Sequence, residues 1–259
     1  MVEVEIVKLS VSRRQVQRLV DCVAEEKPLF IFINKAHFAT VMCSPSRSRE
    51  LIVGHLLSSR IVKSTEEIAE TMMKGDAVQV TLKKNVDLEK RLKFAGTYSR
   101  IILSACGSST PYQYSGKLPK IKSDLKVKAE TILKGVKQLN FIAETFRKTG
   151  GVHAAAIYKH DGGLLASAED VGRHNAVDKV VGSVALSKGS FSECFLALSG
   201  RLTSDIVIKA VAVGLPVVAS LAAALDSGIR VAQEAGLTLI GFARGDRMNI
   251  YTFPERILP

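Results

Sequence analysis

The chain has 259 residues, of which 47% are hydrophobic, so it can bury a sizeable core as one large domain or two smaller ones. No apolar run reaches the length of a membrane span, and the N-terminal residues lack the basic and apolar regions of a signal peptide, so we expect a cytoplasmic protein without a membrane partner. The formal net charge is +11, and residues 1–128 carry most of the surplus, which suggests an anionic partner. Aromatic residues make up only 6% and tryptophan is absent, which argues against nucleic acid as that partner.

The first half predicts a small α+β domain, which we place at residues 1–127. Helix and strand signals are clearest in five stretches: strands over residues 2–8, 28–33, 38–43 and 77–82, and a helix over 47–60. Residues 19–26 and 66–73 are ambiguous or weak, and residues 85–100 are charged and irregular. His55 lies on the apolar face of the predicted helix, so we interpret it as a core histidine rather than a ligand.

The four cysteines stand far apart and include no Cys-x-x-Cys pair, so neither a disulfide framework nor a zinc ribbon is indicated. Cys106 has an unusual setting, because a short apolar run ends there in glycine, serine, threonine and proline. Such small residues cannot pack a core, so we predict an accessible loop. Backbone N–H groups or nearby lysines could lower the pKa of this thiol and favour the thiolate. By itself, however, the pattern also fits an incidental surface cysteine.

The second half predicts an α/β domain at residues 128–259, after a lysine-rich linker. An apolar stripe predicts one long helix over residues 128–148, ended by Gly150 and Gly151. Strands and helices then alternate: strands over 152–158, 164–169, 194–199, 216–220, 238–243 and 249–252, and helices over 173–187, 203–213 and 225–235. This alternation predicts a mainly parallel sheet with flanking helices.

Polar clusters follow three of these strands, at residues 169–179, 198–205 and 242–249. Each cluster contains arginine, and the junctions of strands with helices are common ligand sites in α/β sheets. Each could also be an ordinary turn with solvated charges. Together they predict one anion-binding rim, and residues 169–179 taken alone could be an acid/base centre built around His174.

The order of elements resembles the cytidine-deaminase fold, in which a helix with His-x-Glu and a helix with Pro-Cys-x-x-Cys hold zinc. Here the first helix begins Arg173-His174-Asn175, and Ser199-Gly200-Arg201 precedes the second. Neither the catalytic glutamate nor the thiolates are present, and His153 is likewise followed by alanines. We therefore expect no zinc and no deaminase activity, which measurement of bound zinc would test.

Taken together, the motifs resemble the FdhD/NarQ family of sulfur carrier proteins required for formate dehydrogenase activity. The stretches that carry the resemblance span almost the whole chain: Glu26-Lys27-Pro28-Leu29 with Asn34, Cys43-Ser44-Pro45, residues 51–57, Cys106-Gly107, residues 149–155, residues 169–179, Ser199-Gly200-Arg201, and residues 241–252 with Pro254-Glu255-Arg256. The resemblance implies a cytidine-deaminase-like C-terminal domain, a smaller N-terminal domain, and a homodimer.

The resemblance also implies a function. The carrier would take sulfur from a cysteine desulfurase as a persulfide on Cys106 and pass it to molybdenum in the bis(molybdopterin guanine dinucleotide) cofactor, bound as a substrate, before insertion into formate dehydrogenase. The implied cofactor-binding stretch is Phe242, Ala243, Arg244, Gly245, Asp246 and Arg247. Weaker candidates to position the ligand or the loop are His153, Arg173, His174, Asn175, Gly200 and Arg201.

One departure bears on the chemistry, because many members carry Cys-Gly-x-Cys where this chain has Ser109 as the last residue. A mechanism with two thiols in this loop is therefore excluded, whereas a relay through one thiol is chemically sufficient. The alternative is a non-catalytic chaperone that binds a guanine nucleotide or the molybdenum cofactor. Full activity of a Cys106→Ala variant would favour that alternative.

Overall fold

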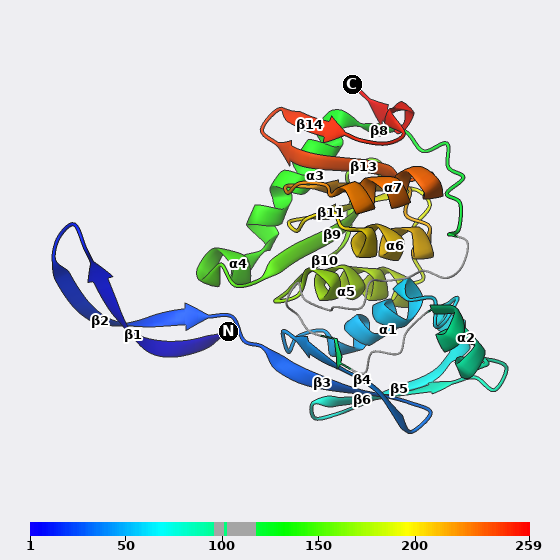
Figure 1. The fold of residues 1–259 in the computed structure, drawn as a ribbon, viewed down its shortest axis with the longest axis horizontal. Coiled ribbons are helices and arrows are strands. Elements are labelled where there is room, and N and C mark those ends of the chain that lie inside the picture. The colour runs from blue at the N-terminus through cyan, green and yellow to red at the C-terminus, as the bar shows by residue number, and fades with distance from the viewer. Residues whose placement is uncertain (96–100, 103–117) are drawn as a thin grey trace.

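The computed structural model describes residues 1–95, 101–102 and 118–259. The Cys106 loop, including Ser109, and the first part of the predicted linker therefore lie outside the described residues. The chain opens with an antiparallel pair of strands, β1 (Val2–Ser10) and β2 (Gln15–Val23), that projects from the body of the molecule (Figure 1). The strand predicted at residues 2–8 is confirmed, and the ambiguous residues 19–23 belong to its partner strand.

A five-stranded sheet follows, with the strand order β5-β6-β3-β4-β7. Its strands are β3 (Lys27–Ile33), β4 (Ala36–Cys43), β5 (Ile68–Lys74), β6 (Ala77–Leu82) and β7 (Ile101–Ile102). Two helices and a short 3-10 turn accompany it: α1 (Ser48–Ser58), α2 (Leu88–Ala95) and η1 (Thr65–Glu67). The predicted strands and the helix after Pro45 are confirmed, whereas part of the stretch expected to be irregular forms α2.

The second half forms a six-stranded sheet with the order β10-β9-β11-β12-β13-β14. Its strands are β9 (His153–Lys159), β10 (Leu164–Asp170), β11 (Cys194–Leu198), β12 (Val217–Ser220), β13 (Thr238–Arg244) and β14 (Arg247–Ile250). The helices of this half are α3 (Ala129–Ile142), α4 (Glu144–Thr149), α5 (Arg173–Leu186), α6 (Ser204–Val213) and α7 (Asp226–Ala235). A small parallel pair, β8 (Val127–Lys128) with β15 (Ile257–Leu258), and the turn η2 (Pro254–Arg256) lie near the C-terminus.

The prediction of a mainly parallel sheet is wrong. Only the pairs β11–β12 and β12–β13 are parallel, whereas β10–β9, β9–β11 and β13–β14 are antiparallel. The reason lies in the connections, because tight turns join β9 to β10 and β13 to β14, and a short turn can join only antiparallel neighbours. The fold is mixed α/β.

The single long helix predicted over residues 128–148 is interrupted at Ala143, where φ is −87° and ψ is 77°. The Glu169 carboxylate accepts the backbone N–H groups of Thr145 (3.0 Å) and Phe146 (2.7 Å). N–H groups in the first turn of a helix have no partner within that helix, so the Glu169 carboxylate stabilises the beginning of α4. The apolar stripe could not reveal the break, because α3 and α4 keep a similar pattern on both sides.

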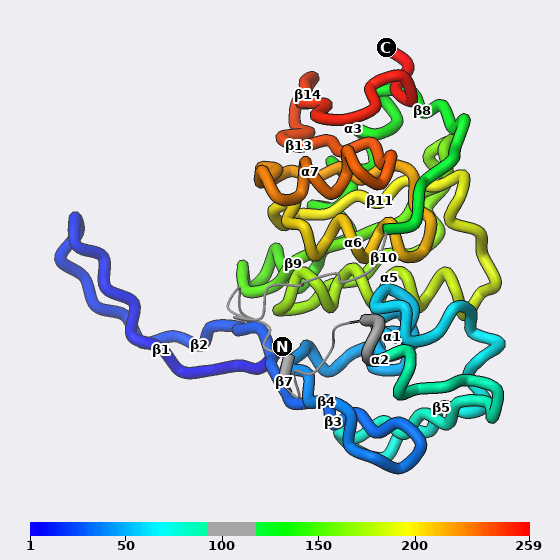
Figure 2. Tube along the Cα trace, turned by 45° about the vertical axis from the view of Figure 1, so that its right-hand side comes forward, coloured from blue at the N-terminus to red at the C-terminus, as the bar shows by residue number. Residues whose placement is uncertain are grey.

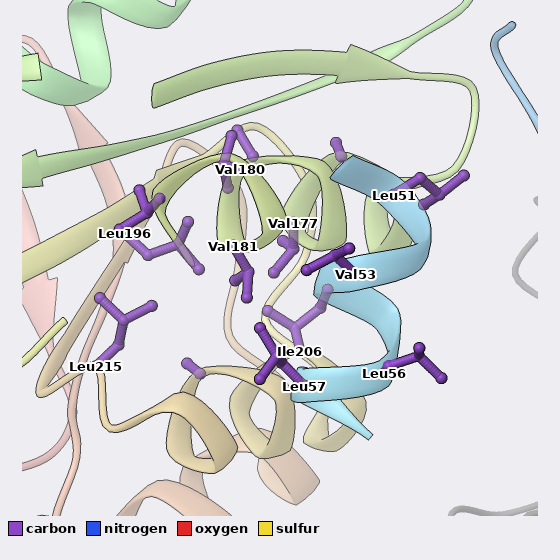
Figure 3. Packing of buried hydrophobic residues seen from close by; sticks show 14 of the residues in the cluster. Leu51, Val53, Leu56, Leu57, Val177, Val180, Val181, Leu196, Ile206 and Leu215 are labelled. Atoms are coloured by element: carbon purple, nitrogen blue, oxygen red, sulfur yellow. The ribbon is translucent and has the colours of Figure 1, made fainter. Parts of the chain in front are cut away.

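The two halves share one hydrophobic core. Buried side chains from β3, β4, α1 and β6 form a continuous cluster with those of α5, α6 and one face of the six-stranded sheet. The second face of that sheet packs against α3 in a separate core. Figure 2 shows α1 lying beside α5, and Figure 3 shows Val53 of α1 close to Val177 of α5. The boundary placed at residue 127 stays a prediction.

The close approach of α1 and α5 depends on two glycines. A Cβ atom added at Gly54 would lie 1.8 Å from the carbonyl oxygen of Asp178, and one added at Gly182 would lie 1.9 Å from that of Glu50. Each helix therefore touches the backbone of the other, which fixes the position of the first half on the second. None of the helices in the described ranges is long and apolar enough to cross a membrane.

Candidate functional site

The three polar clusters lie along one edge of the six-stranded sheet. Strands β11, β12 and β13 run parallel, so the residues that follow them emerge at the same edge. Strand β9 runs antiparallel to β11, which brings its first residue, His153, to this edge. Asp170 at the end of β10 pairs with His153, so the cluster at residues 169–179 begins there as well. The predicted convergence of the clusters is confirmed.

His153, Arg173 and Gly200 are close together at this edge. Ser199 lies beside them: its Oγ is 3.3 Å from His153 Nδ1 and accepts the backbone N–H of Ala154 at 3.0 Å. A Cβ atom at Gly200 would lie 3.1 Å from both Cβ and Cδ of Arg173, and 3.5 Å from His153 Nδ1. Glycine at position 200 thus leaves room for the side chain of the buried Arg173.

Burial, followed by the positive charges of Arg173 and Arg201, lowers the pKa of His153 below its usual value. The imidazole is therefore neutral at physiological pH and can accept a hydrogen bond at one ring nitrogen. A cavity of about 360 Å³ opens beside it, between the strand ends and the helices α3 and α4. Its wall includes His153, Ser199, Val171, Leu221 and Phe146. This cavity can accept a small group of a larger ligand.

His174 is also neutral, for a similar reason. Burial, together with the charges of Lys209 and Arg173, lowers its pKa to about 3. Its Nε2 atom has no hydrogen-bond partner among the described residues and lies 3.8 Å from Asp205 Oδ2, at the start of α6. An imidazole with such a pKa does not exchange a proton near neutral pH. The arrangement favours a positioning role over the acid/base role considered for this residue.

Asn175 contacts the first half of the chain. Its side-chain amide donates to the carbonyl oxygen of Met42 and to Asp170 Oδ1, both at 2.9 Å, and only 4% of the residue is exposed. The structure does not bring Asn175 to the surface of the cavity beside His153. These contacts connect the end of β4 to the start of α5.

Two residues that sequence reasoning did not single out complete this connection. Asp170 Oδ2 lies 2.6 Å from Lys179 Nζ, and both side chains are fully buried. Lys179 also donates to the carbonyl oxygen of Ser44, whose own N–H donates to Asp170. Asp170 and Lys179 therefore bind the Cys43-Ser44-Pro45 turn, so part of the polar character of residues 169–179 serves contacts within the chain.

The stretch from Phe242 to Arg247 forms the end of β13 and its turn into β14. The pairing of these strands shifts register between Gly241 and Arg244, and Phe242 has a positive φ of 51°. This bulge redirects the half-buried Phe242 ring, and the Arg244 guanidinium lies 5.7 Å from its centroid. Arg244, Gly245, Asp246 and Arg247 are exposed, whereas Ala243 is buried. The turn thus presents two arginines and one aromatic ring to solvent.

The exposed Arg201 follows β11 at the same edge. Together with Arg244 and Arg247 it gives the edge three cationic groups suited to phosphate. The Phe242 ring, which can stack on a purine, lies beside Arg244. Within the described ranges, no group of three or more histidine, cysteine, aspartate or glutamate side chains could hold a metal ion.

The described cysteines differ in reactivity. Cys43 and Cys194 are each only 2% exposed. Burial, followed by the charge of Asp170, raises the pKa of Cys43 to about 12, and burial raises that of Cys194 to about 11. Both thiols are therefore protonated near neutral pH, and a protonated, covered thiol is a poor nucleophile. Cys22 is partly exposed in β2.

Comparison with known proteins connects this architecture to a family. The family model described as the FdhD/NarQ family matches residues 24–258. The protein named sulfur carrier protein FdhD from Sulfolobus acidocaldarius is 37% identical over 239 residues, which cover 92% of this chain and 91% of that protein. The protein of the same name from Saccharolobus solfataricus is 39% identical over 243 residues and covers the same shares.

A solved structure is also similar. It is a crystal structure, described as that of a candidate formate dehydrogenase accessory protein from Desulfotalea psychrophila, which superposes with a TM-score of 0.83 at 26% identity. The superposition covers 99% of each chain, so the mixed α/β fold with its five-stranded and six-stranded sheets is shared as a whole. The family model spans both halves, including the strand ends and the turn that binds Asp170. The chain belongs to the FdhD/NarQ family.

Proposed function

We propose that this protein is a sulfur carrier that supports the maturation of formate dehydrogenase. The observation that carries the proposal is the family match over residues 24–258, together with relatives at 37% and 39% identity that are named sulfur carrier proteins. The similar solved structure, described in terms of formate dehydrogenase, supports the choice of client. We expect the protein to act in the cytoplasm.

The acceptor in this proposal is Cys106. Its thiolate attacks the terminal sulfur of a persulfide on a cysteine desulfurase, so a new S–S bond forms on Cys106 and the desulfurase cysteine leaves as thiolate. No net oxidation or reduction occurs in this exchange. The raised pKa values of Cys43 and Cys194 support the assignment by making those two thiols poor acceptors. Cys22 precedes the stretch matched by the family model.

The substrate that receives the sulfur is the molybdenum cofactor with its two guanine dinucleotides. The edge of the six-stranded sheet supports this part of the proposal, because its exposed groups suit such a ligand. Arg201, Arg244 and Arg247 can pair with phosphates, and the half-buried Phe242 ring can stack against guanine. His153, neutral because of its lowered pKa, can accept a hydrogen bond from a base or pterin.

The test uses a host whose own member of the family has been deleted and which produces this chain instead. In that host we expect Cys106→Ala to abolish formate dehydrogenase activity. The physical reason is that alanine has no sulfur atom and therefore cannot hold a persulfide. The measurement is formate-dependent dye reduction in cell extracts, with the amount of the variant protein determined in the same extracts.

Cys22→Ser provides the matched control, because it removes one partly exposed thiol outside the family match, and it is expected to keep full activity. Full activity of Cys106→Ala would instead favour the non-catalytic chaperone, which binds the cofactor without carrying sulfur. Loss of activity in both variants would also contradict the assignment to Cys106 alone.

A further inference from the structure

A second pocket lies away from the candidate site, and we call it the basic pocket. It is formed by the ends of α1 and α6, the first turn of α2, and the residues Pro119 and Phe191. Its volume is about 520 Å³, within the range of roughly 300–1,000 Å³ that is usual for binding pockets. Helix α6 begins at the edge with the three polar clusters and reaches the basic pocket at its other end, and a helix of ten residues rises about 15 Å. The basic pocket is therefore separate from the candidate site.

Part of the wall of this pocket is apolar. Leu57 and Val62 are buried, whereas Ala212, Val213 and Phe191 are half-buried and keep part of their surface in contact with solvent. The inner sides of Val213 and Phe191 pack against the main core, which fixes their positions. An apolar side chain of a ligand would lose its contact with water by entering here, and this favours binding.

Among the described residues of the wall, all the charged ones are cations: Arg60, Lys63, Lys90 and Arg91. Two carboxylates lie nearby, but contacts within the chain engage them. Glu67 pairs with Arg91 at 3.1 Å and accepts the backbone N–H of Lys63 at 2.7 Å. Asp87 accepts the backbone N–H of Lys90 at 3.0 Å. The side chains of Lys63 and Lys90 are exposed, so their charges are presented to solvent at the pocket.

The position of Lys90 and Arg91 is unfavourable for the helix that carries them. Both lie in the first turn of α2, where the helix has a partial positive charge and cations are destabilising. Arg60, by contrast, follows the end of α1, where a cation is favourable. The stability of α2 therefore does not explain its two cations, and their place at an apolar pocket favours binding of an anionic group.

We propose that the basic pocket binds an acidic peptide segment of a partner protein. One apolar side chain of the segment lies between the ends of α1 and α6, and its carboxylates lie beside Lys63 and Lys90. The pocket is complementary to such a segment in both charge and polarity. The inference rests on the pocket alone and does not depend on the proposed sulfur transfer.

A single strand of nucleic acid is also anionic, but it suits this pocket less well. Proteins that bind such strands combine a basic groove with several aromatic rings on which the bases stack. Among the described residues of the wall, Phe191 is the one aromatic side chain, and part of its surface is buried against the core. The aliphatic side chains that make up the rest of the apolar wall suit an aliphatic side chain better than a base.

Fluorescence anisotropy of a labelled peptide tests the pocket directly. The probe is a short peptide of aspartate and glutamate with one central leucine and with fluorescein at its N-terminus, and it is titrated with this chain. We expect saturable binding that weakens as salt is added, because salt screens the attraction. Lys63→Glu with Lys90→Glu is expected to weaken binding at least about tenfold, since two attractions become repulsions. Ala212→Leu keeps the net charge but fills the space for the leucine, so it is also expected to weaken binding.

Lys137→Glu with Lys159→Glu is the matched control, because it changes the net charge equally at exposed positions on α3 and β9, and it is expected to bind the peptide as the wild type does. A second probe with serine in place of leucine is expected to bind at least about tenfold more weakly, because serine gains little from burial. Circular dichroism of each variant checks that the protein stays folded.

Four results would overturn the proposal. They are a leucine probe that does not bind the wild type, equal affinity of the leucine and serine probes, and an equal loss of affinity in the pocket and control variants. The fourth is tighter binding of a single-stranded oligonucleotide of the same charge through Lys63 and Lys90, which would assign the pocket to nucleic acid instead.

Discussion

Gly54→Ala is expected to destabilise the protein by at least about 3 kcal/mol, the range of severe overpacking. The added Cβ atom would lie 1.8 Å from the Asp178 carbonyl oxygen and 2.6 Å from its carbon, so two backbones must separate. Separation of α1 from α5 would loosen the core that joins the two halves of the chain. The measurement is the free energy of unfolding from urea titration, followed by circular dichroism.

Gly163→Ala is the matched control, because the new Cβ atom would meet only the side-chain atoms of Asp161 at 3.2 Å and Lys159 at 3.9 Å. Those side chains can move, so the expected change is within about 1 kcal/mol. Equal stability of the Gly54→Ala variant and the wild type would contradict the close approach of the two helices. Gly182→Ala is expected to match Gly54→Ala, since its Cβ would lie 1.9 Å from the Glu50 carbonyl oxygen.

Lys179→Met is expected to destabilise the protein by about 3–5 kcal/mol, the usual cost of breaking a buried ion pair on one side. Methionine has a similar length but leaves the buried Asp170 carboxylate without its cation at 2.6 Å. Burial already raises the pKa of Asp170, and Lys179 is the main group that opposes this shift. Without the lysine, the pKa of Asp170 rises further and the carboxyl group binds a proton. The measurements are urea unfolding and the proton uptake on folding.

Lys134→Met is the matched control, because it makes the same substitution in an exposed ion pair. The side chains of Lys134 and Glu130 are 69% and 73% exposed. Its expected effect is below about 1 kcal/mol, because solvent screens such pairs. If both methionine variants unfold at the same urea concentration, the buried pair does not hold the Ser44 turn in the way the contacts indicate. A turn released from Asp170 and Lys179 would also become accessible to proteases, which gives a second readout.

Local pattern was sufficient to predict most helices and strands. The alternation at residues 77–82 and the glycine that follows α4 reflect forces between neighbours in sequence, and the structure has β6 and Gly150 at those positions. One of the features that were missed depends on a distant partner. The break at Ala143 needs the Glu169 carboxylate. Periodicity describes one segment at a time, so it contains no such signal.

The candidate site also contains some features that the sequence pattern predicted and others that depend on residues distant in the chain. The convergence of residues 169–179, 198–205 and 242–249 follows from the order and direction of the strands, and it was predicted from the polar clusters at strand ends. The place of His153 beside them was not part of that prediction. The role of Asp170 and Lys179 in holding Ser44 was not predicted, because those residues are more than a hundred positions from the turn they bind. A cluster of charged residues looks alike in sequence whether it faces a ligand or another part of the chain.

The central claim, that sulfur is carried on Cys106, is tested most directly by mapping the persulfide. The purified protein is incubated with a cysteine desulfurase and cysteine, and peptides are then examined by mass spectrometry for an added sulfur atom on each of the four cysteines. We predict the added sulfur on Cys106, its loss in Cys106→Ala and its persistence in Cys22→Ser. Sulfur spread evenly over all four cysteines, or absent from Cys106, would contradict the account.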